Sequence, residues 1–145
     1  MAQKWLILPM VFVLLLVSCA QHSAQNLTIE TRQGEVPITI EIADSPEERQ
    51  LGLMNRQSME EHSGMWFVFD QEYPYAFWMK NTLIPLDMVF VNSNMQIIDI
   101  IAADPCQKNP CKTYTPQASA LYVLEVNQNF TARAGVQIGN RVKVG

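Results

Sequence analysis

The sequence predicts a small α+β fold that is mainly antiparallel β, forms one barrel-like domain and contains one or two short helices. Three observations predict this fold class. Short apolar segments recur along the chain, several of them alternate with polar residues, and turn residues separate them, as in antiparallel strands. Only two segments carry helix signals, and both are short. Residues 19–145 are numerous enough for one hydrophobic core without a metal or dense disulfides.

Residues 1–18 are predicted to be a lipoprotein signal peptide. Lys4 precedes an apolar run over 6–17, which is shorter than the roughly 20 residues of a transmembrane helix. The run ends in Leu-Val-Ser-Cys, which resembles the bacterial lipobox, so Cys19 is the expected lipidation site; the alternative is an ordinary secretory signal with an unrelated cysteine. Because Ala20 follows Cys19, resemblance to Gram-negative sorting signals favours a lipid anchor in the outer membrane, facing the periplasm.

Residues 19–26 are polar and are expected to be a tether to the single β-rich domain, residues 27–145. Segments 27–31 and 36–43 alternate between apolar and polar residues, and Gly34 lies in the turn between them. This pattern predicts a hairpin at the start of the domain.

A short helix is predicted immediately after this hairpin. Ser45 is a favourable N-cap, Pro46 suits the first helical position, and Glu48 completes a capping box. Gly52 weakens or ends the helix after about two turns.

The remaining chain predicts mostly strands. Residues 58–64 are expected to form a turn, residues 127–135 a helical turn, and residues 136–144 two short strands around a Gly-Asn turn. The other expected strands are 65–69, 76–79, 86–92, 95–103 and 121–126.

Cys106 and Cys111 form a C-x4-C pair in a proline-containing loop. In an oxidising compartment this pair predicts a local disulfide. A metal site or a redox pair are the alternatives, but Lys108 and Lys112 flank the cysteines in place of further ligands, and C-x-x-C is the usual redox spacing.

The composition and the motifs disfavour several function classes. The net charge is −4 and no basic run is present, which disfavours nucleic acid as a partner and leaves the N-terminal lipid as the expected contact with a membrane. No phosphate loop, dinucleotide fingerprint, G-x-S-x-G or H-E-x-x-H motif occurs. We therefore expect no cofactor and no metal, and we interpret the methionines as core residues rather than copper ligands.

Five segments carry a resemblance to a known family: ERQLGLMNRQSM, GMWFVFD, FWMKNTLIPLDMVFV, YVLEV and AGVQIGNRV. Their order and spacing resemble the bacterial and archaeal domain of unknown function 192 family over about residues 36–144. The resemblance implies a small β-rich domain, often exported and often lipid-anchored, with no established activity. No catalytic residue is therefore transferred. Asn140 departs from the Gly-Asp turn usual in relatives, which argues against a role that needs a charge there.

Segment 76–87 places strong polar groups beside large apolar side chains, an arrangement that suits a hydroxyl-rich ligand. The alternative is that these polar groups fasten loops, for example through an ion pair of Asp87 with an arginine. The predicted ligand-binding residues are Lys80, Asn81, Asp87, Trp66, Trp78, Arg49 and Arg56.

The favoured function is a binding or accessory module of the cell envelope for a small polar ligand such as carbohydrate. One alternative is a hydrolase that uses Asp87 or Glu125 as acid or base. Glu125 lies in an apolar strand, so its side chain either points to water or is buried, as the partner of an arginine or as an acid with a raised pKa. The other alternative is a protein–protein interaction module of the envelope. The question of catalysis stays open, with an enzyme disfavoured.

Overall fold

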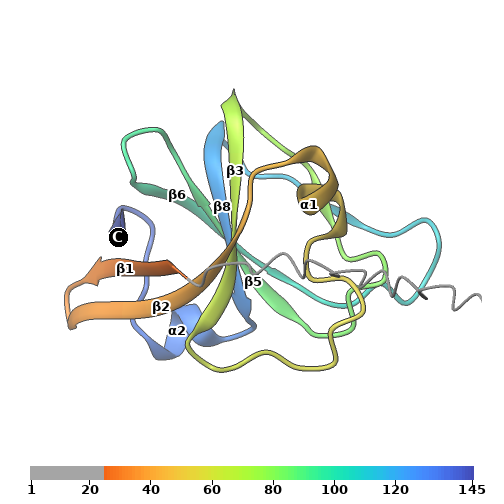
Figure 1. The fold of residues 1–145 in the computed structure, drawn as a ribbon, viewed down its shortest axis with the longest axis horizontal. Helices are drawn as coiled ribbons and strands as arrows, with labels where there is room; N and C mark the ends of the chain where they lie inside the picture. Colours follow the sequence, from red (N-terminus) through yellow and green to blue (C-terminus); the bar gives the residue numbers. More distant parts are fainter. Residues whose placement is uncertain (1–24) are drawn as a thin grey trace, which may run out of the picture.

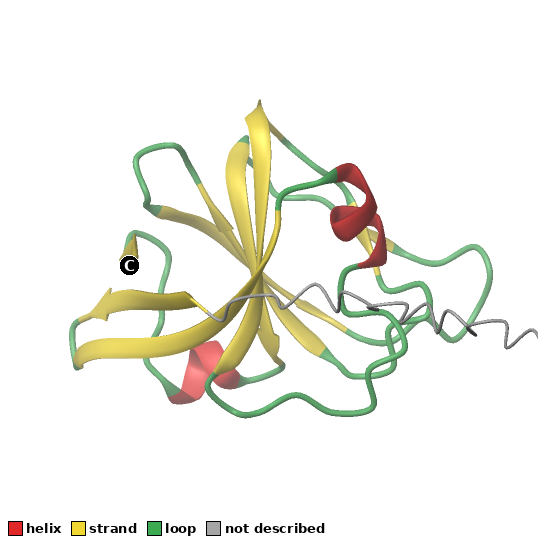
Figure 2. Ribbon diagram, viewed as in Figure 1, coloured by secondary structure: helices red, strands yellow, loops and turns green. Residues whose placement is uncertain are grey.

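The computed structural model of the protein describes residues 25–145, which form one small domain around a curled, mainly antiparallel sheet (Figure 1; Figure 2). Seven strands follow the order β6-β5-β8-β3-β2-β1-β9, and β4 pairs with β7 in a separate two-stranded sheet. Of the pairs in the large sheet, β2–β3 is parallel. The strands are β1 (Gln25–Thr31), β2 (Gly34–Ala43), β3 (Ser63–Tyr73), β4 (Phe77–Trp78), β5 (Leu86–Val91), β6 (Ile97–Ala103), β7 (Thr113–Tyr114), β8 (Ala120–Asn127) and β9 (Arg141–Val144).

The large sheet curls until its two edges meet at one point. An isolated bridge joins Gln96, just before β6, to Arg141 at the start of β9. Beside it, the Val142 amide donates to the Met95 carbonyl at 2.9 Å, and the Ile97 amide donates to the Asn140 carbonyl at 2.9 Å. The sheet is therefore a half-barrel, and the predicted fold class is confirmed.

Apolar side chains fill both faces of the central strands β3, β8 and β5. One face is the interior of the half-barrel, where the second helix, α2 (Phe130–Arg133), contributes Phe130. The other face forms a second core under α1 (Pro46–Leu51) and the loops beside it, on the right in Figure 1. Successive residues along each of these strands therefore lie in different cores, while directly paired residues such as Trp66 and Leu124 share one.

The helix α1 has the predicted ends. The Glu48 amide donates to the Ser45 hydroxyl at 3.2 Å, and the Glu48 carboxylate accepts from the Ser45 amide at 3.0 Å. Pro46 occupies the first turn and Gly52, at φ 48°, is the C-cap. The capping box therefore fixes where this short helix begins.

Several elements differ from the prediction: β3 spans Ser63–Tyr73 rather than 65–69, and the short strand β7 was not predicted. The first strand begins at Gln25 rather than at residue 27, because Gln25 and Asn26 extend the ladder with β2. The final hairpin was predicted wrongly. Segment 136–140 forms a turn that the Asn140 side chain closes by accepting from the Gln137 amide at 2.7 Å, and β9 pairs with β1 instead.

Candidate functional site

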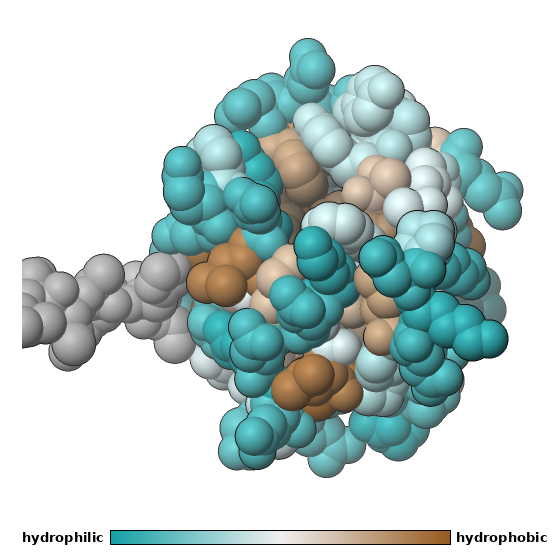
Figure 3. Space-filling model, turned by 90° about the vertical axis from the view of Figure 1, so that its right-hand side faces the viewer, coloured by the Kyte–Doolittle hydropathy of each residue, from teal (hydrophilic) through white to brown (hydrophobic). Residues whose placement is uncertain are grey.

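One face of the domain combines exposed apolar side chains with surface hollows. It is formed by α1, segment 76–85 and the loop that carries Cys106 and Cys111, and Figure 3 views the molecule from this side. Trp78 is 48% exposed on this face, and Leu51 and Leu83 are 59% and 55% exposed. Large apolar side chains at this exposure are uncommon enough together to suggest a contact surface.

Three residues of segment 76–85 form what we call the Trp78 ridge: Trp78, Lys80 and Asn81. The Lys80 ammonium lies 5.0 Å from the centre of the Trp78 ring, which is cation–π distance. Asn81 adopts a left-handed backbone with φ 57°, and its carbonyl accepts from the Asn55 amide at 2.8 Å. This bond ties the ridge to the segment that follows α1, so the exposed side chains rest on a fixed turn.

The ridge separates two clefts. The helix-side cleft, of about 420 Å³, lies between the ridge and α1 and is lined by Glu47, Gln50, Leu51 and Met54 together with the ridge. The loop-side cleft, of about 380 Å³, lies between the ridge and the disulfide loop, 106–111. Trp78 therefore presents an aromatic side chain to two hollows, with an amide and an ammonium group beside it.

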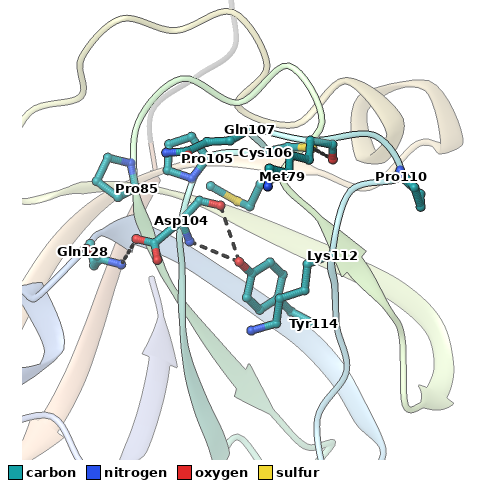
Figure 4. A pocket seen from close by; sticks show the side chains of 11 residues that line it. Met79, Pro85, Asp104, Pro105, Cys106, Gln107, Pro110, Lys112, Tyr114 and Gln128 are labelled. Atoms are coloured by element: carbon teal, nitrogen blue, oxygen red, sulfur yellow. Dashed lines mark hydrogen bonds between the residues drawn. The ribbon is translucent and has the colours of Figure 1, made fainter.

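The largest of the pockets described for residues 25–145, of about 530 Å³, lies on the other side of the disulfide loop (Figure 4). Its polar groups bond mainly to each other. Tyr114 accepts from the Asp104 amide at 3.2 Å, and Gln128 donates to the Asp104 carboxylate at 3.1 Å. The Lys112 ammonium lies 4.5 Å from the Tyr114 ring centre. Asp104, Tyr114 and Gln128 thus already have partners, and the Tyr114 ring is buried, so we place the candidate site at the Trp78 ridge, where the aromatic side chain is exposed.

Positive charge gathers around the disulfide loop although the chain is acidic. Residues 25–145 contain four lysines. Lys80, Lys108 and Lys112 line the loop-side cleft or the largest pocket, while Lys143 pairs with Glu30 in the sheet. Within the described residues, the first three lysines have no carboxylate partner at ion-pair distance. The lining of the loop-side cleft is therefore complementary to a negatively charged group.

Cys106 and Cys111 form the predicted disulfide, with 5.4 Å between their Cα atoms. The bridge closes the loop that forms one wall of the loop-side cleft. It therefore limits the conformations available to that wall.

Replacing both cysteines with serine is expected to lower the free energy of unfolding by about 2 kcal/mol, because the bridge closes only a short loop. Urea melts of the variant and the parent measure this difference. Thiol counting on mature protein that is denatured but not reduced should find no free thiol. Two free thiols, or a stoichiometric metal, would contradict the assignment.

Glu125 lies in β8 beneath the ridge and is 5% exposed. Met65 of β3 and Met88 of β5 are its cross-strand neighbours. Burial raises the pKa of its carboxyl to about 8, so the group is mainly protonated at neutral pH. Of the two alternatives for Glu125, the structure thus supports the buried acid. It lines a small inner cavity that is described further below.

Asp87 and Trp66 lie away from the ridge. Asp87 is 3% exposed and accepts from the Thr131 amide at 3.1 Å and the Thr131 hydroxyl at 2.6 Å. Trp66 is buried inside the half-barrel and stacks on Tyr122 with 5.0 Å between ring centres. The structure therefore does not bring Asp87 and Trp66 into one site with Lys80 and Asn81. Side chains alternate between the two faces along β3 and β5, and those of Trp66 and Asp87 point to the face away from the ridge.

The two carboxylates of the hydrolase alternative do not share a cleft. In the β5–β8 register Asp87 pairs with Val126, while Glu125 pairs with Met88. Neighbouring residues of a strand point to opposite faces, so Asp87 faces the half-barrel interior and Glu125 the second core.

The two predicted arginines have structural partners. Arg56 forms a bidentate pair with Glu41, at 2.5 and 2.6 Å, and this pair raises the pKa of the guanidinium. Arg49 donates to the carbonyls of Asp44 and Val68, the latter at 2.8 Å. Arg49 also lines the inner cavity, whereas Arg56 lines neither cleft. An ion pair of either arginine with Asp87 is not formed.

The sequence prediction named Arg49 of α1 but missed the residues on the α1 side that line the helix-side cleft. Gln50, Leu51 and Met54 line the helix-side cleft. The usable signal was an apolar residue at the end of a very short helix. The helix has six residues and buries none of them, so Leu51 at its last position is exposed. Nothing in the local sequence indicates that the helix lies opposite Trp78.

Residues 25–145 contain neither a membrane-spanning helix nor a metal-binding cluster of side chains. None of the helices there is long and apolar enough to cross a membrane. Nor does this part of the chain bring together three or more His, Cys, Asp or Glu side chains in a cluster that could hold a metal ion. Cys19 and the predicted signal peptide lie outside the described residues.

Comparisons with known proteins agree with the fold. A crystal structure from Sinorhizobium meliloti 1021, of a protein described as a "putative transcription regulator", is 34% identical and superposes with a TM-score of 0.78 over 85% of this chain and 95% of that one. A protein of unknown function from Novosphingobium aromaticivorans DSM 12444 is 30% identical, with a TM-score of 0.76 over 81% of this chain and 83% of that one.

Sequence comparison identifies the family. A UPF0127 protein of Pyrococcus furiosus is 25% identical over 118 residues, which cover 78% of this chain and 92% of that relative. The family model for domain of unknown function 192, described as an uncharacterized ACR, matches residues 28–144. The chain therefore belongs to the domain of unknown function 192 family.

Proposed function

We propose that this protein is a lipoprotein of the cell envelope whose domain binds a small polar ligand, such as a carbohydrate, at the Trp78 ridge. The observation that carries the proposal is the half-exposed Trp78 between two clefts, flanked by Lys80 and Asn81. Sugar rings stack their C–H faces on aromatic side chains, and amide and ammonium groups orient their hydroxyls. The ridge offers both kinds of contact on one rigid turn.

The lysines narrow the ligand class. Lys80 and Lys108 line the loop-side cleft, and neither has a carboxylate partner within the described residues. A sugar that carries a carboxylate would place its charge there while its ring lies against Trp78. We therefore expect N-acetylmuramic acid to bind more tightly than N-acetylglucosamine, which has the same ring and acetamido group without the acid.

Asn81→Gly is expected to abolish the stabilisation that such a sugar gives. A ligand at 100 times its Kd adds about 2.7 kcal/mol to the stability of the parent. Glycine is the sharper replacement, because Asn81 has φ 57° and alanine would add backbone strain to the loss of the amide. Urea melts with and without N-acetylmuramic acid measure the effect.

Asn81→Ala is the matched variant. If the amide only fastens the turn, both variants lose stability without ligand and still respond fully to the sugar. That result would refute the site. A full ligand response in Asn81→Gly would do so as well.

Cys19→Ala is expected to leave the protein without lipid, because the lipobox offers its thiol as the acceptor. Radiolabelled fatty acid should be incorporated into the parent only, and the parent should fractionate with the outer membrane. Continued labelling of the variant would contradict the lipoprotein proposal. The test leaves ligand binding untouched, so anchor and site are judged separately.

A protein–protein interaction module of the envelope is the second candidate. The observation that favours it is the exposure of Leu51 and Leu83 on the same face as Trp78. Replacing Leu83, which lines neither cleft, with serine should leave the sugar response intact if the site is the ridge. The second candidate would be favoured if the parent shows no sugar response and if the replacement removes a cross-link between this face and another envelope protein.

A further inference from the structure

The Glu125 residue is 5% exposed, and its carboxyl has no hydrogen-bond or ion-pair partner in the described part of the protein, so its oxygens face the small accessible space beside them. Its strand neighbours across the sheet are the apolar Met65 and Met88. A polar group in such surroundings costs stability unless something satisfies it. The other buried acid, Asp87, has both of its partners in Thr131.

The space in front of Glu125 is a small inner cavity of about 40 Å³. A water-sized group needs about 10–15 Å³, so the cavity holds about three such groups and no sugar ring. Four of its lining residues also line the helix-side cleft: Gln50, Leu51, Met54 and Trp78. The inner cavity therefore adjoins the helix-side cleft and shares the wall that Trp78 and the end of α1 form.

Among the described residues, one other charged side chain lines the cavity beside Glu125. Arg49, from α1, is the other charged residue of the described lining, and its guanidinium already donates to two carbonyls. The remaining elements around the cavity contribute Phe67, Phe77, Trp78 and Thr82, which carry no charge. Burial, rather than a neighbouring charge, accounts for the raised pKa of Glu125. At neutral pH the carboxyl therefore has an O–H to donate.

We propose that the inner cavity is a subsite of the helix-side cleft, where Glu125 in its protonated form donates a hydrogen bond to an oxygen of an uncharged ligand group. A hydroxymethyl group or an amide carbonyl has the size and chemistry required. This inference rests on the proposed function and adds the contact in the adjoining inner cavity. It also orients the ligand, with the uncharged group at Glu125 and an acidic group near Lys108.

The first experiment measures the affinity for N-acetylmuramic acid at pH 6 and pH 9 by titration calorimetry. In the parent, affinity should fall about ten-fold at pH 9, because a carboxyl with a pKa of about 8 is then roughly nine-tenths ionised and cannot donate. In Glu125→Gln, the amide still donates, so affinity should be similar at both pH values. In Glu125→Leu, affinity should be at least ten-fold weaker at both.

The second experiment separates this inference from the proposed function. Crystals of the parent are soaked in methanol, whose one hydroxyl fits the inner cavity. Methanol at Glu125 in the parent and its absence in Glu125→Leu support the subsite even where no sugar binds the ridge. If Glu125→Leu binds the sugar as tightly as the parent does, the subsite is overturned, while the proposed site at the ridge stands. An inner cavity that takes no methanol, with a parent that binds no sugar, overturns both.

Discussion

Raising the pH from 4.5 to 8 is expected to destabilise the parent relative to Glu125→Gln by up to roughly 5 kcal/mol. The pKa of Glu125 is about 8 in the folded protein, against an ordinary value of 4.5. Between these values the folded state holds a proton that the unfolded state has released. Stability therefore falls with pH across this window, by about 1.4 kcal/mol per pH unit.

The sign is the reverse of that for an ordinary paired carboxylate. Below pH 4.5 Glu125 is protonated in both states, and its contribution to stability is fully present. It decreases as the pH rises and is lost once the pH passes the folded pKa of about 8. Glutamine has nearly the same shape and no proton to lose, so Glu125→Gln removes this pH dependence and leaves that of the other groups.

Urea melts of parent and variant at unit intervals from pH 4 to pH 9 measure the difference. Glu125→Leu serves as a second variant, because it lacks both the proton and the hydrogen bond and should track Glu125→Gln in its pH dependence. Parallel stability curves for all three proteins would show that Glu125 titrates near its ordinary pKa. The buried acid would then be solvated, and the subsite would lose its donor.

Much of the fold could be predicted from local sequence because its signals are local. The capping box at Ser45 and Glu48, the alternation in the first hairpin and the C-x4-C spacing each act within a few residues. The final segment was predicted wrongly because strand partners are not local. The alternating pattern of residues 141–144 is compatible with pairing to a hairpin partner and equally with pairing to β1.

The candidate site was only partly predictable for the same reason. Trp78, Lys80 and Asn81 are close in sequence and remain close in space. Trp66 and Asp87 carry similar chemistry, but the face each one occupies depends on strand register, which brief apolar runs such as β3 and β5 do not fix. Glu125 stood out as an acid in an apolar strand, yet its cavity also needs three other segments, around α1, in β3 and over 77–82.

Asp87→Ala is expected to cost about 3 kcal/mol of stability, although the side chain was predicted to bind a ligand. Asp87 lies on β5 and accepts from both the amide and the hydroxyl of Thr131 at the start of α2. Asn129, the N-cap of α2, makes no capping bond with its own side chain. Asp87 therefore supplies the missing acceptor, and its removal leaves two buried donors unsatisfied, at about 1–3 kcal/mol each.

A double-mutant cycle with Thr131→Val tests this account. Thr131→Val removes the hydroxyl but keeps the amide, so alone it should cost about 1–2 kcal/mol. Once Asp87 is alanine, the same change should cost at least 0.5–1 kcal/mol less, because the hydroxyl no longer has its partner. Additive costs would show that Asp87 and Thr131 do not act on each other. Asp87→Ala should also keep the full stabilisation by N-acetylmuramic acid, because its side chain faces the half-barrel interior and the Trp78 ridge lies on the other side of the sheet.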